Sequence, residues 1–247
     1  MNIKKTPYKI LIGFIALILI SLISFIIYFY LMLNYEERLT ERLTDDVIVI
    51  NDLLSSMYLV RVDSTYLAID TGFFDSFLER GLEYNNILPD EIKYIFLTHS
   101  DADHVNNIKL FKSAKVFFPK EEKEMLDNKR QRFTFLPFYS NEIDLANYNL
   151  IQEGDSVMLG NRKIKFISLP GHTKGSMGFI VDDKYLFSGD AFRLKNGKIS
   201  VPFRKYFVTS ENKMLETIHK VSKLDSIKYI FTAHSGFTAD FQFAISK

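Results

Sequence analysis

Four of the five histidines in this 247-residue chain lie at the ends of strand-like apolar runs. They occur in the stretches "KYIFLTHSDADH", "KIKFISLPGH" and "KYIFTAHSG". In folds that alternate strands and helices, the loops after the strands gather at one edge of a sheet, where binding sites form. The chain is therefore expected to fold so that several strands end close together, around a shared cluster of imidazoles.

The stretch "HSDADH" carries His99, Asp101, Asp103 and His104 within six residues. A polar turn that caps the next helix would account for one of the aspartates. It does not account for histidines on both sides of them. Two imidazoles and two carboxylates at this spacing can chelate one or two divalent ions, so we interpret the stretch as a metal-binding motif.

Three further candidates stand in separate loops. His172 follows the turn in "LPGHTKGS", Asp190 ends "YLFSGD", and His234 lies in "YIFTAHSG". Taken singly, each is typical of a polar surface residue or a turn former. Their shared position after strands favours one common site. His219 lies inside the helical stretch "ETIHKV", and we interpret it as a structural or surface residue.

These stretches resemble a known family. Asp70 in "AIDTG", then "THSDADH", "LPGHTKGS", "FSGD" and "AHSG", occur in the order seen in the metallo-β-lactamase fold hydrolases. The resemblance spans nearly the whole chain after its N-terminal apolar segment. It implies an α/β fold, an αββα sandwich of two mixed sheets flanked by helices. It does not specify the substrate, because this superfamily includes β-lactam, thioester and lactone hydrolases, nucleases and diiron oxidoreductases.

The resemblance also implies two divalent metal ions, with zinc expected and iron or manganese as alternatives. The implied ligands are His99, Asp101, Asp103, His104, His172, Asp190 and His234. In the family pattern Asp190 bridges the two ions, and we expect Asp103 and Asp190 to be the catalytic carboxylates. Asp70 is similar to the buried aspartate that orients ligand histidines from behind.

One position departs from the family pattern, which is usually His-x-His-x-Asp-His. Asp101 replaces the second histidine. A carboxylate oxygen and an imidazole Nδ1 are both two bonds from Cβ, so Asp101 can occupy the same ligand position if that position binds through Nδ1. A carboxylate adds negative charge and makes iron or manganese more competitive with zinc.

Residues 10–33 form an apolar run, "ILIGFIALILISLISFIIYFYLML", without a charged side chain. At about 1.5 Å per residue, a helix of this length spans the roughly 30 Å hydrocarbon core of a bilayer. A cleaved signal peptide is the alternative, but its apolar region is normally about 7 to 15 residues. We predict a cytoplasmic tail at 1–9, a transmembrane helix at 10–33, a linker at 34–45 and a folded domain at 46–247.

Charges that flank the apolar run indicate its orientation. Lys4, Lys5 and Lys9 precede it, whereas acidic and basic residues are mixed after it. Positive flanks tend to stay in the cytoplasm. We therefore expect a single-pass protein of the cell membrane with a cytoplasmic N-terminus and an extracytoplasmic catalytic domain.

Composition narrows the partners and the chemistry. The chain has no cysteine, which excludes disulfides and thiolate ligands, and its 31 basic and 30 acidic residues nearly balance. This balance offers no electrostatic reason to expect nucleic acid. We expect a small-molecule substrate; the sequence does not indicate the oligomeric state.

The leading functional hypothesis is a hydrolase that uses metal-activated water on an ester, lactone or related bond. The alternatives are a phosphodiesterase, a diiron oxidoreductase and a non-catalytic membrane-tethered binding protein. We expect selectivity to come from aromatic and basic segments, with Arg193, Arg204 and Lys205 as candidate anion-binding residues. Residues 119–150 are expected to form either a surface helix with a packed loop or a lid over the site.

Secondary structure follows from the spacing of apolar residues. Strands are predicted at "VIVI", "MYLVRV", "TYLAID", "KYIFLT", "KVFFP", "KIKFISL", "GSMGFIV", "KYLFSGD" and "YIFTA". Helices are predicted at "DSFLERGLEY", "VNNIKLFKSA" and "ENKMLETIHKVSKL".

Overall fold

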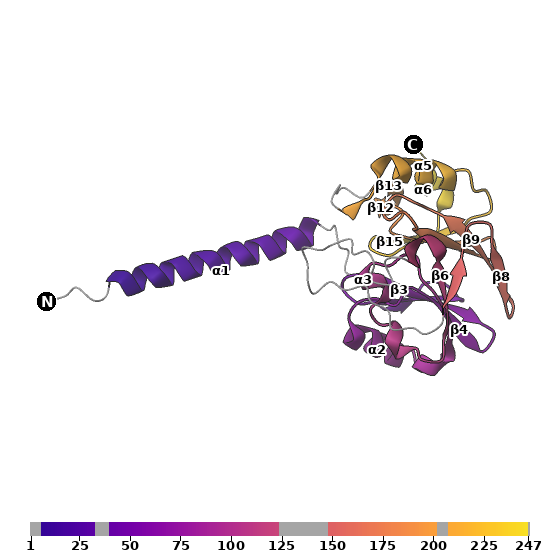
Figure 1. The fold of residues 1–247 in the computed structure, drawn as a ribbon, viewed down its shortest axis with the longest axis horizontal. Helices are drawn as coiled ribbons and strands as arrows, with labels where there is room; N and C mark the ends of the chain where they lie inside the picture. The colour runs from indigo at the N-terminus through magenta and orange to yellow at the C-terminus, as the bar shows by residue number, and fades with distance from the viewer. Residues whose placement is uncertain (1–5, 33–39, 124–147, 202–206, 247) are drawn as a thin grey trace. The chain divides into compact units, whose positions relative to one another are not determined.

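The structure is a computed structural model of the chain that describes residues 6–32, 40–123, 148–201 and 207–246 (Figure 1). The chain divides into two compact units, residues 1–36 and residues 37–247. The described residues of the first unit form one helix, and the second unit contains the sheets. Each unit is described by itself.

Helix α1 (Thr6–Met32) has 27 residues, which corresponds to about 40 Å. Its stretch Lys9–Ile27 has a mean hydropathy of 3.1, and none of that stretch is buried. By length and composition the helix could therefore cross a membrane or serve as a signal sequence.

The first sheet of the second unit has seven strands in the order β1-β2-β3-β4-β5-β6-β7. Its strands are β1 (Glu41–Arg42), β2 (Val47–Asn51), β3 (Ser56–Val62), β4 (Thr65–Ile69), β5 (Ile92–Phe96), β6 (Lys115–Pro119) and β7 (Asn149–Ile151). Strands β1 to β4 pair antiparallel, and β4 to β7 pair parallel. The sheet is therefore mixed, and its parallel half carries the motif loop after β5.

The second sheet has six strands in the order β15-β14-β11-β10-β9-β8. Its strands are β8 (Ser156–Leu159), β9 (Arg162–Ser168), β10 (Met177–Val181), β11 (Tyr185–Gly189), β14 (Tyr229–Thr232) and β15 (Gly236–Thr238). Among the strand pairs described for this sheet, β11 with β14 is parallel and the others are antiparallel. A separate hairpin joins β12 (Arg193–Lys195) to β13 (Lys198–Ser200).

Three of the described helices lie on the outer faces of the two sheets: α2 (Asp75–Tyr84) on the first sheet, and α5 (Glu211–Val221) and α6 (Phe241–Ile245) on the second (Figure 1). The short helix α3 (Ala102–Val105) stands in the loop after β5. Short 3₁₀ turns are η1 (Pro89–Glu91), η2 (Ile108–Leu110) and η3 (Lys120–Glu122). The order of layers is helix, sheet, sheet, helix, as the family resemblance implied.

Alternation along the strands produces these layers. In β2, Val47 and Val49 face the other sheet and pack in one core cluster with Phe179 and Phe187. The intervening Ile48 and Ile50 belong instead to a cluster that includes Leu78 of α2. Successive side chains of a strand point to opposite faces, so an entirely apolar strand is buried on both sides.

Two regions differ from the sequence-based prediction. The helix expected over residues 105–114 is wrong, because the chain forms only α3 and the turn η2 there. Asn106 and Asn107 donate side-chain hydrogen bonds to the backbone carbonyls of Phe73 and Thr71 (2.8 and 3.0 Å), which competes with helix formation. Residues 41–42, expected in the linker, pair with β2 as strand β1.

Several expectations concern residues outside the described ranges. The segment expected as a lid falls largely on residues 124–147, and Arg204 and Lys205 are likewise not described. The remaining predicted strands and helices coincide with β2 to β6, β9 to β11, β14, α2 and α5.

Candidate metal centre

The candidate ligands come from loops at the ends of strands in both sheets. The loop after β5 carries His99 to His104, and the loop after β9 carries His172. Asp190 follows β11 directly, and His234 comes two residues after the end of β14. The two sheets meet at this edge, where the Met177 amide donates to the Thr98 carbonyl (2.9 Å).

One group of side chains joins the two sheets through Asp101. Its Oδ2 lies 3.0 Å from His172 Nε2 and 3.5 Å from His99 Nε2. One atom from each of the three residues lies within 4.8 Å of the others, a spacing that could hold a metal ion. The carboxylate that departs from the family motif therefore points into the site.

A second group consists of Asp103, His104 and His234, whose potential ligand atoms also lie within 4.8 Å of one another. Asp103 Oδ2 is 3.6 Å from His104 Nε2 and 3.3 Å from His234 Nε2.

Asp190 lies between the two groups. Its Oδ2 is 3.1 Å from His234 Nε2 and 3.3 Å from His172 Nε2, and its Oδ1 is 3.5 Å from His104 Nε2. The structure thus brings together all seven side chains that the sequence singled out.

Buried atoms without hydrogen bonds mark the centre of the cluster. His99 Nε2, His104 Nε2 and Asp190 Oδ1 are buried and have no hydrogen-bond partner among the described residues. A buried polar atom without a partner is costly unless something else satisfies it. Their three residues form one group that could hold a metal ion, so the donor set fits a divalent cation.

Residues behind the cluster direct the imidazoles. Thr98 Oγ1 donates to Asp70 Oδ2 (2.8 Å), so the same hydroxyl oxygen accepts from His99 Nδ1 (2.9 Å). His104 Nδ1 donates to Asp70 Oδ2 at 2.8 Å, and His234 Nδ1 donates to the backbone carbonyl of Leu54 at 2.6 Å. Because each Nδ1 is engaged in this way, Nε2 is the nitrogen that each of the three rings presents to a cation, which would replace any proton held there.

Asp70 adopts a left-handed backbone conformation (φ 59°) at the end of β4. Its carboxylate also accepts from the Thr98 amide at 2.7 Å. A strained residue persists only where its surroundings hold it, and here three donors to one carboxylate do so.

The loop between β2 and β3 supports the second group, which the sequence did not indicate. Ser55 Oγ donates to the backbone carbonyl of Asp103, and Leu54 supplies the acceptor for His234. Asp52 organises this loop by accepting from the amides of Leu54 (3.0 Å) and Ser55 (2.7 Å). Burial raises the pKa of Asp52 despite these hydrogen bonds. No local motif reveals the loop, because its partners lie far along the chain.

The carboxylates create a strongly negative field in the centre. Burial alone would lower the pKa of His104, but the charges of Asp103, Asp70 and Asp190 raise it well above its usual value. Burial likewise opposes protonation of His234, yet Asp190 and Asp103 raise its pKa to about 9. The same field favours divalent cations over neutral occupants.

Asp190 shows the converse effect. Burial would raise the pKa of Asp190, but the neighbouring imidazoles of His234, His172 and His104 hold it well below its usual value. Its carboxylate is therefore ionised at neutral pH, as a bridging ligand must be.

The cluster is open on one side. The side chains of His99 and His104 have no exposure, whereas those of Asp103 and His234 are 14% and 34% exposed. A substrate would thus approach the second group first.

Other candidate residues lie apart from the cluster or border it. His219 is exposed on α5. Burial lowers the pKa of Arg193, which begins β12. The amide of the next residue, Leu194, donates a hydrogen bond to Ser235 Oγ (2.7 Å), beside His234.

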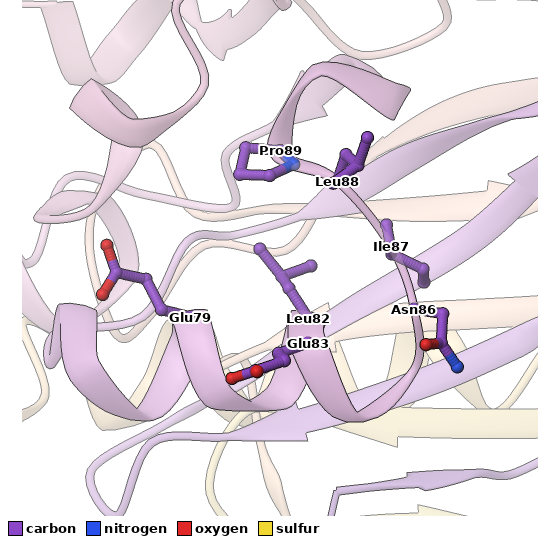
Figure 2. A pocket seen from close by; sticks show the side chains of 7 residues that line it. All are labelled: Glu79, Leu82, Glu83, Asn86, Ile87, Leu88 and Pro89. Atoms are coloured by element: carbon purple, nitrogen blue, oxygen red, sulfur yellow. The ribbon is translucent and has the colours of Figure 1, made fainter.

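A surface pocket of about 410 Å³ contains none of the candidate ligands (Figure 2). It lies between the C-terminal part of α2 and the turn after it, and its lining residues are Glu79, Leu82, Glu83, Asn86, Ile87, Leu88 and Pro89.

Curated relatives are enzymes. The chain is 32% identical over 160 residues to a hydroxyacylglutathione hydrolase of Blochmanniella pennsylvanica, covering 63% of this chain and 53% of that protein. It is 28% identical over 172 residues to a probable metallo-hydrolase of Methanocaldococcus jannaschii, covering 69% and 71%. The chain thus spans about half the length of the hydroxyacylglutathione hydrolase that it matches.

Solved structures share the fold. A metallo-β-lactamase from Cronobacter sakazakii superposes with a TM-score of 0.64 at 17% identity, over 80% of this chain and 81% of that one. A β-lactamase from Chitinophaga pinensis gives 0.63 at 19%, over 80% and 78%. The family model of the metallo-β-lactamase superfamily matches residues 50–234. With that match over most of its length, the chain belongs to the metallo-β-lactamase superfamily.

Proposed function

We propose that the protein is a hydrolase that binds two divalent metal ions and cleaves an ester, lactone or related bond of a small molecule. The observation that carries this proposal is the position of Asp190 between two groups of ligand atoms, His99, Asp101 and His172 on one side and Asp103, His104 and His234 on the other. Such a carboxylate suits the bridge of a two-ion centre.

Divalent ions in such a centre lower the pKa of a water molecule and polarise the oxygen of the bond that is attacked. The chain's own residues hold the ligands in place and orient the water. Asp70, Thr98 and Leu54 keep the imidazoles in the ligand tautomer. Asp103 is partly exposed at the open side of the cluster, where its carboxylate orients the attacking water towards a substrate carbonyl.

The curated relatives support hydrolysis of a small molecule. Their names include hydroxyacylglutathione hydrolase and probable metallo-hydrolase. The chain spans 53% of the hydroxyacylglutathione hydrolase, so the proposal extends to the class of reaction and leaves that enzyme's substrate aside. We expect no nucleic-acid partner, because the formal net charge of +1 offers no electrostatic attraction to phosphates.

Helix α1 supports the location that we propose. Its length and apolar composition suit a single-pass anchor of the cell membrane. Three lysines before the span favour a cytoplasmic N-terminus and an extracytoplasmic catalytic domain. Apolar esters and lactones concentrate at membranes, so an anchor would bring the enzyme to its substrate.

Asp101 favours a second candidate, a diiron oxidoreductase. Its carboxylate lies between His99 and His172, and an oxygen ligand there makes iron or manganese more competitive. A phosphodiesterase would use the same residues, but no observation favours it. A non-catalytic binding protein would not need this ligand set.

The test is elemental analysis of the full chain, purified in detergent without added metal, followed by an ester, lactone and β-lactam screen. We expect about two equivalents of metal per chain. Asp103→Asn should lower kcat by about 100-fold, the scale on which loss of one group that stabilises the transition state acts. His219→Gln is the matched control and should leave metal content and rate unchanged.

Each result has a defined meaning. Zinc with ester or lactone turnover supports the hydrolase, and iron without turnover moves the assignment to the oxidoreductase. Full activity of Asp103→Asn on a cleaved substrate contradicts the two-ion mechanism. Absence of metal after reconstitution contradicts both enzymatic assignments.

A further inference from the structure

Glu122 is a buried acidic residue outside the ligand cluster. It ends η3, the turn that follows β6, and only 1% of its surface is exposed. Glutamate is almost never fully buried unless its carboxylate is paired or hydrogen-bonded. Its neighbour Glu121, by contrast, has an exposed side chain. The burial of Glu122 therefore needs a structural reason.

The carboxylate of Glu122 joins two loops. Oε2 accepts from the amide and the hydroxyl of Ser100 (3.2 and 2.6 Å), and Oε1 accepts from the amide of Gly175 (2.9 Å). Ser100 stands between His99 and Asp101 in the loop after β5. Gly175 comes three residues after His172 in the loop after β9. One side chain thus ties together the two loops that carry the whole first group.

The fit of Glu122 against Gly175 is close. A Cβ atom at residue 175 would lie 2.6 Å from Glu122 Oε1 and 2.8 Å from its Cγ. Any larger residue at this position would displace the carboxylate. Gly175→Ala is therefore a second way to disturb the same contact without removing the charge.

Other hydrogen bonds keep both loops folded without Glu122. The Leu169 amide donates to Ser176 O (2.8 Å), and the Met177 amide donates to Thr98 O (2.9 Å). Loss of Glu122 should therefore change the spacing between the loops rather than unfold them. The second group is held separately, by Asp70 behind His104 and by Leu54 behind His234.

We propose that Glu122 is a positioning residue that sets the distance of His172 from His99 and Asp101, and thereby the affinity of the ion that this group binds. The inference rests on the proposed metal-dependent function. Partners of metal ligands typically change metal affinity by about 10- to 100-fold when they are mutated. The expected effect is selective for one of two ions.

The conservative variant separates hydrogen bonding from packing. Glu122→Gln keeps the size of the side chain but replaces one acceptor oxygen with a donor. The –NH₂ group of the new side chain would face an N–H donor of either Ser100 or Gly175. The hydrogen bond to one of the two loops is therefore lost, and the other is kept. Glu122→Ala removes both contacts. Glu121→Gln is the matched control, because it alters an exposed carboxylate one residue away.

The experiment titrates metal-free full chain in detergent with Zn²⁺ against a chromophoric chelator, and with Co²⁺ while recording its visible absorption. Wild type should bind two ions. Glu122→Gln and Gly175→Ala should bind one of them about 10- to 100-fold more weakly and alter the Co²⁺ bands of that site. Glu122→Ala should weaken the binding of that ion further. Glu121→Gln should match wild type.

The outcomes distinguish this inference from the proposed function. Wild type that binds no metal contradicts the function, and the inference with it. If wild type and Glu122→Gln both bind two ions with equal affinity, the inference about Glu122 is wrong and the proposed function stands. A variant that weakens both ions equally and unfolds at a lower temperature when metal-free has a general structural role, which also overturns the inference.

Discussion

Asp101 shows how a single residue can change the character of a site without moving it. Its Oδ2 lies 3.0 Å from His172 Nε2, so the carboxylate faces the same cluster as the imidazoles. Four carboxylates, those of Asp70, Asp101, Asp103 and Asp190, then surround the centre. Two divalent ions would balance that charge in full, whereas a histidine at residue 101 would leave an excess positive charge.

We predict that Asp101→His shifts metal preference towards zinc. Imidazole suits zinc better than a carboxylate does, relative to manganese and iron. The ratio of zinc to manganese bound from an equimolar mixture should rise several-fold, as measured by elemental analysis. Asp101→Asn, which keeps an oxygen donor without the charge, is the control. An unchanged ratio in Asp101→His would mean that residue 101 does not bind metal.

The sequence revealed residues of this site only where they were close together or followed recognisable strands. The spacing within "HSDADH" is local, so His99 to His104 could be recognised. Glu122 could not, because it stands in the polar run "PKEEKE", which is typical of a surface helix. Its partner Gly175 lies 53 residues further along the chain, and only folding brings them together.

Among the elements, Arg162 at the start of β9 provides a polar link between the two sheets, in addition to their shared apolar core. Its Nε donates to the carbonyl of Arg61 on β3 (2.8 Å), and Nη1 donates to Asp182 (2.7 Å). Nη2 donates to Asp46, just before β2. A planar guanidinium can serve three acceptors in fixed directions, and a lysine ammonium cannot do so in the same geometry.

We predict that Arg162→Lys lowers the free energy of unfolding at pH 7 by roughly 2 kcal/mol, the scale of hydrogen bonds to charged groups. Urea unfolding of the full chain in detergent, followed by circular dichroism, measures the change. Lys165→Gln is the control, because its ion pair with Asp183 is exposed and should contribute under about 1 kcal/mol. Equal losses in both variants would contradict a special role for Arg162.

The ion pair between Arg162 and Asp46 predicts that stability depends on pH. Burial would raise the pKa of Asp46, but the hydrogen bond and charge of Arg162 lower it below its usual value. An acid with a depressed folded-state pKa contributes stability above its unfolded pKa, about 3.9, and loses it as pH falls through the folded value. The difference between wild type and Arg162→Lys should therefore shrink below about pH 4.

Strands buried on both faces could be predicted from the sequence, whereas short strands at the edge of a sheet or outside the two sheets could not. Strand β2 contains only apolar residues from Val47 to Ile50, so its burial follows from the sequence. Strand β8, "SVML", and the hairpin of β12 and β13 are short and only partly buried, and they lack such a signal. Residues 105–114 have helical spacing, but two asparagine side chains bind the neighbouring loop instead.

At the scale of the whole molecule, the chain combines an apolar helix with a domain that is nearly neutral overall. Helix α1 has no charged side chain between Lys9 and its end at Met32. Such a helix supports the proposed anchor, and the lysines before its uncharged stretch support the proposed orientation.

We predict that alkaline phosphatase fused to the C-terminus of the full chain is active, and that green fluorescent protein at the same position is not fluorescent, because the domain is exported. Replacing Lys4, Lys5 and Lys9 with glutamate removes the positive flank and should reduce or reverse this pattern. Fluorescence with silent phosphatase in the unaltered chain would place the domain in the cytoplasm.

The ligand groups have a consequence for folding as well as for chemistry. Each group takes side chains from both sheets; Asp101 and His172, for example, stand 71 residues apart. An ion held between them would be a cross-link in a chain that has no cysteine. Its binding free energy would add to that of folding, by about 1.4 kcal/mol for each tenfold rise in free metal at a saturated site. The concentration of free metal would then determine the stability of the folded protein as well as its catalytic rate.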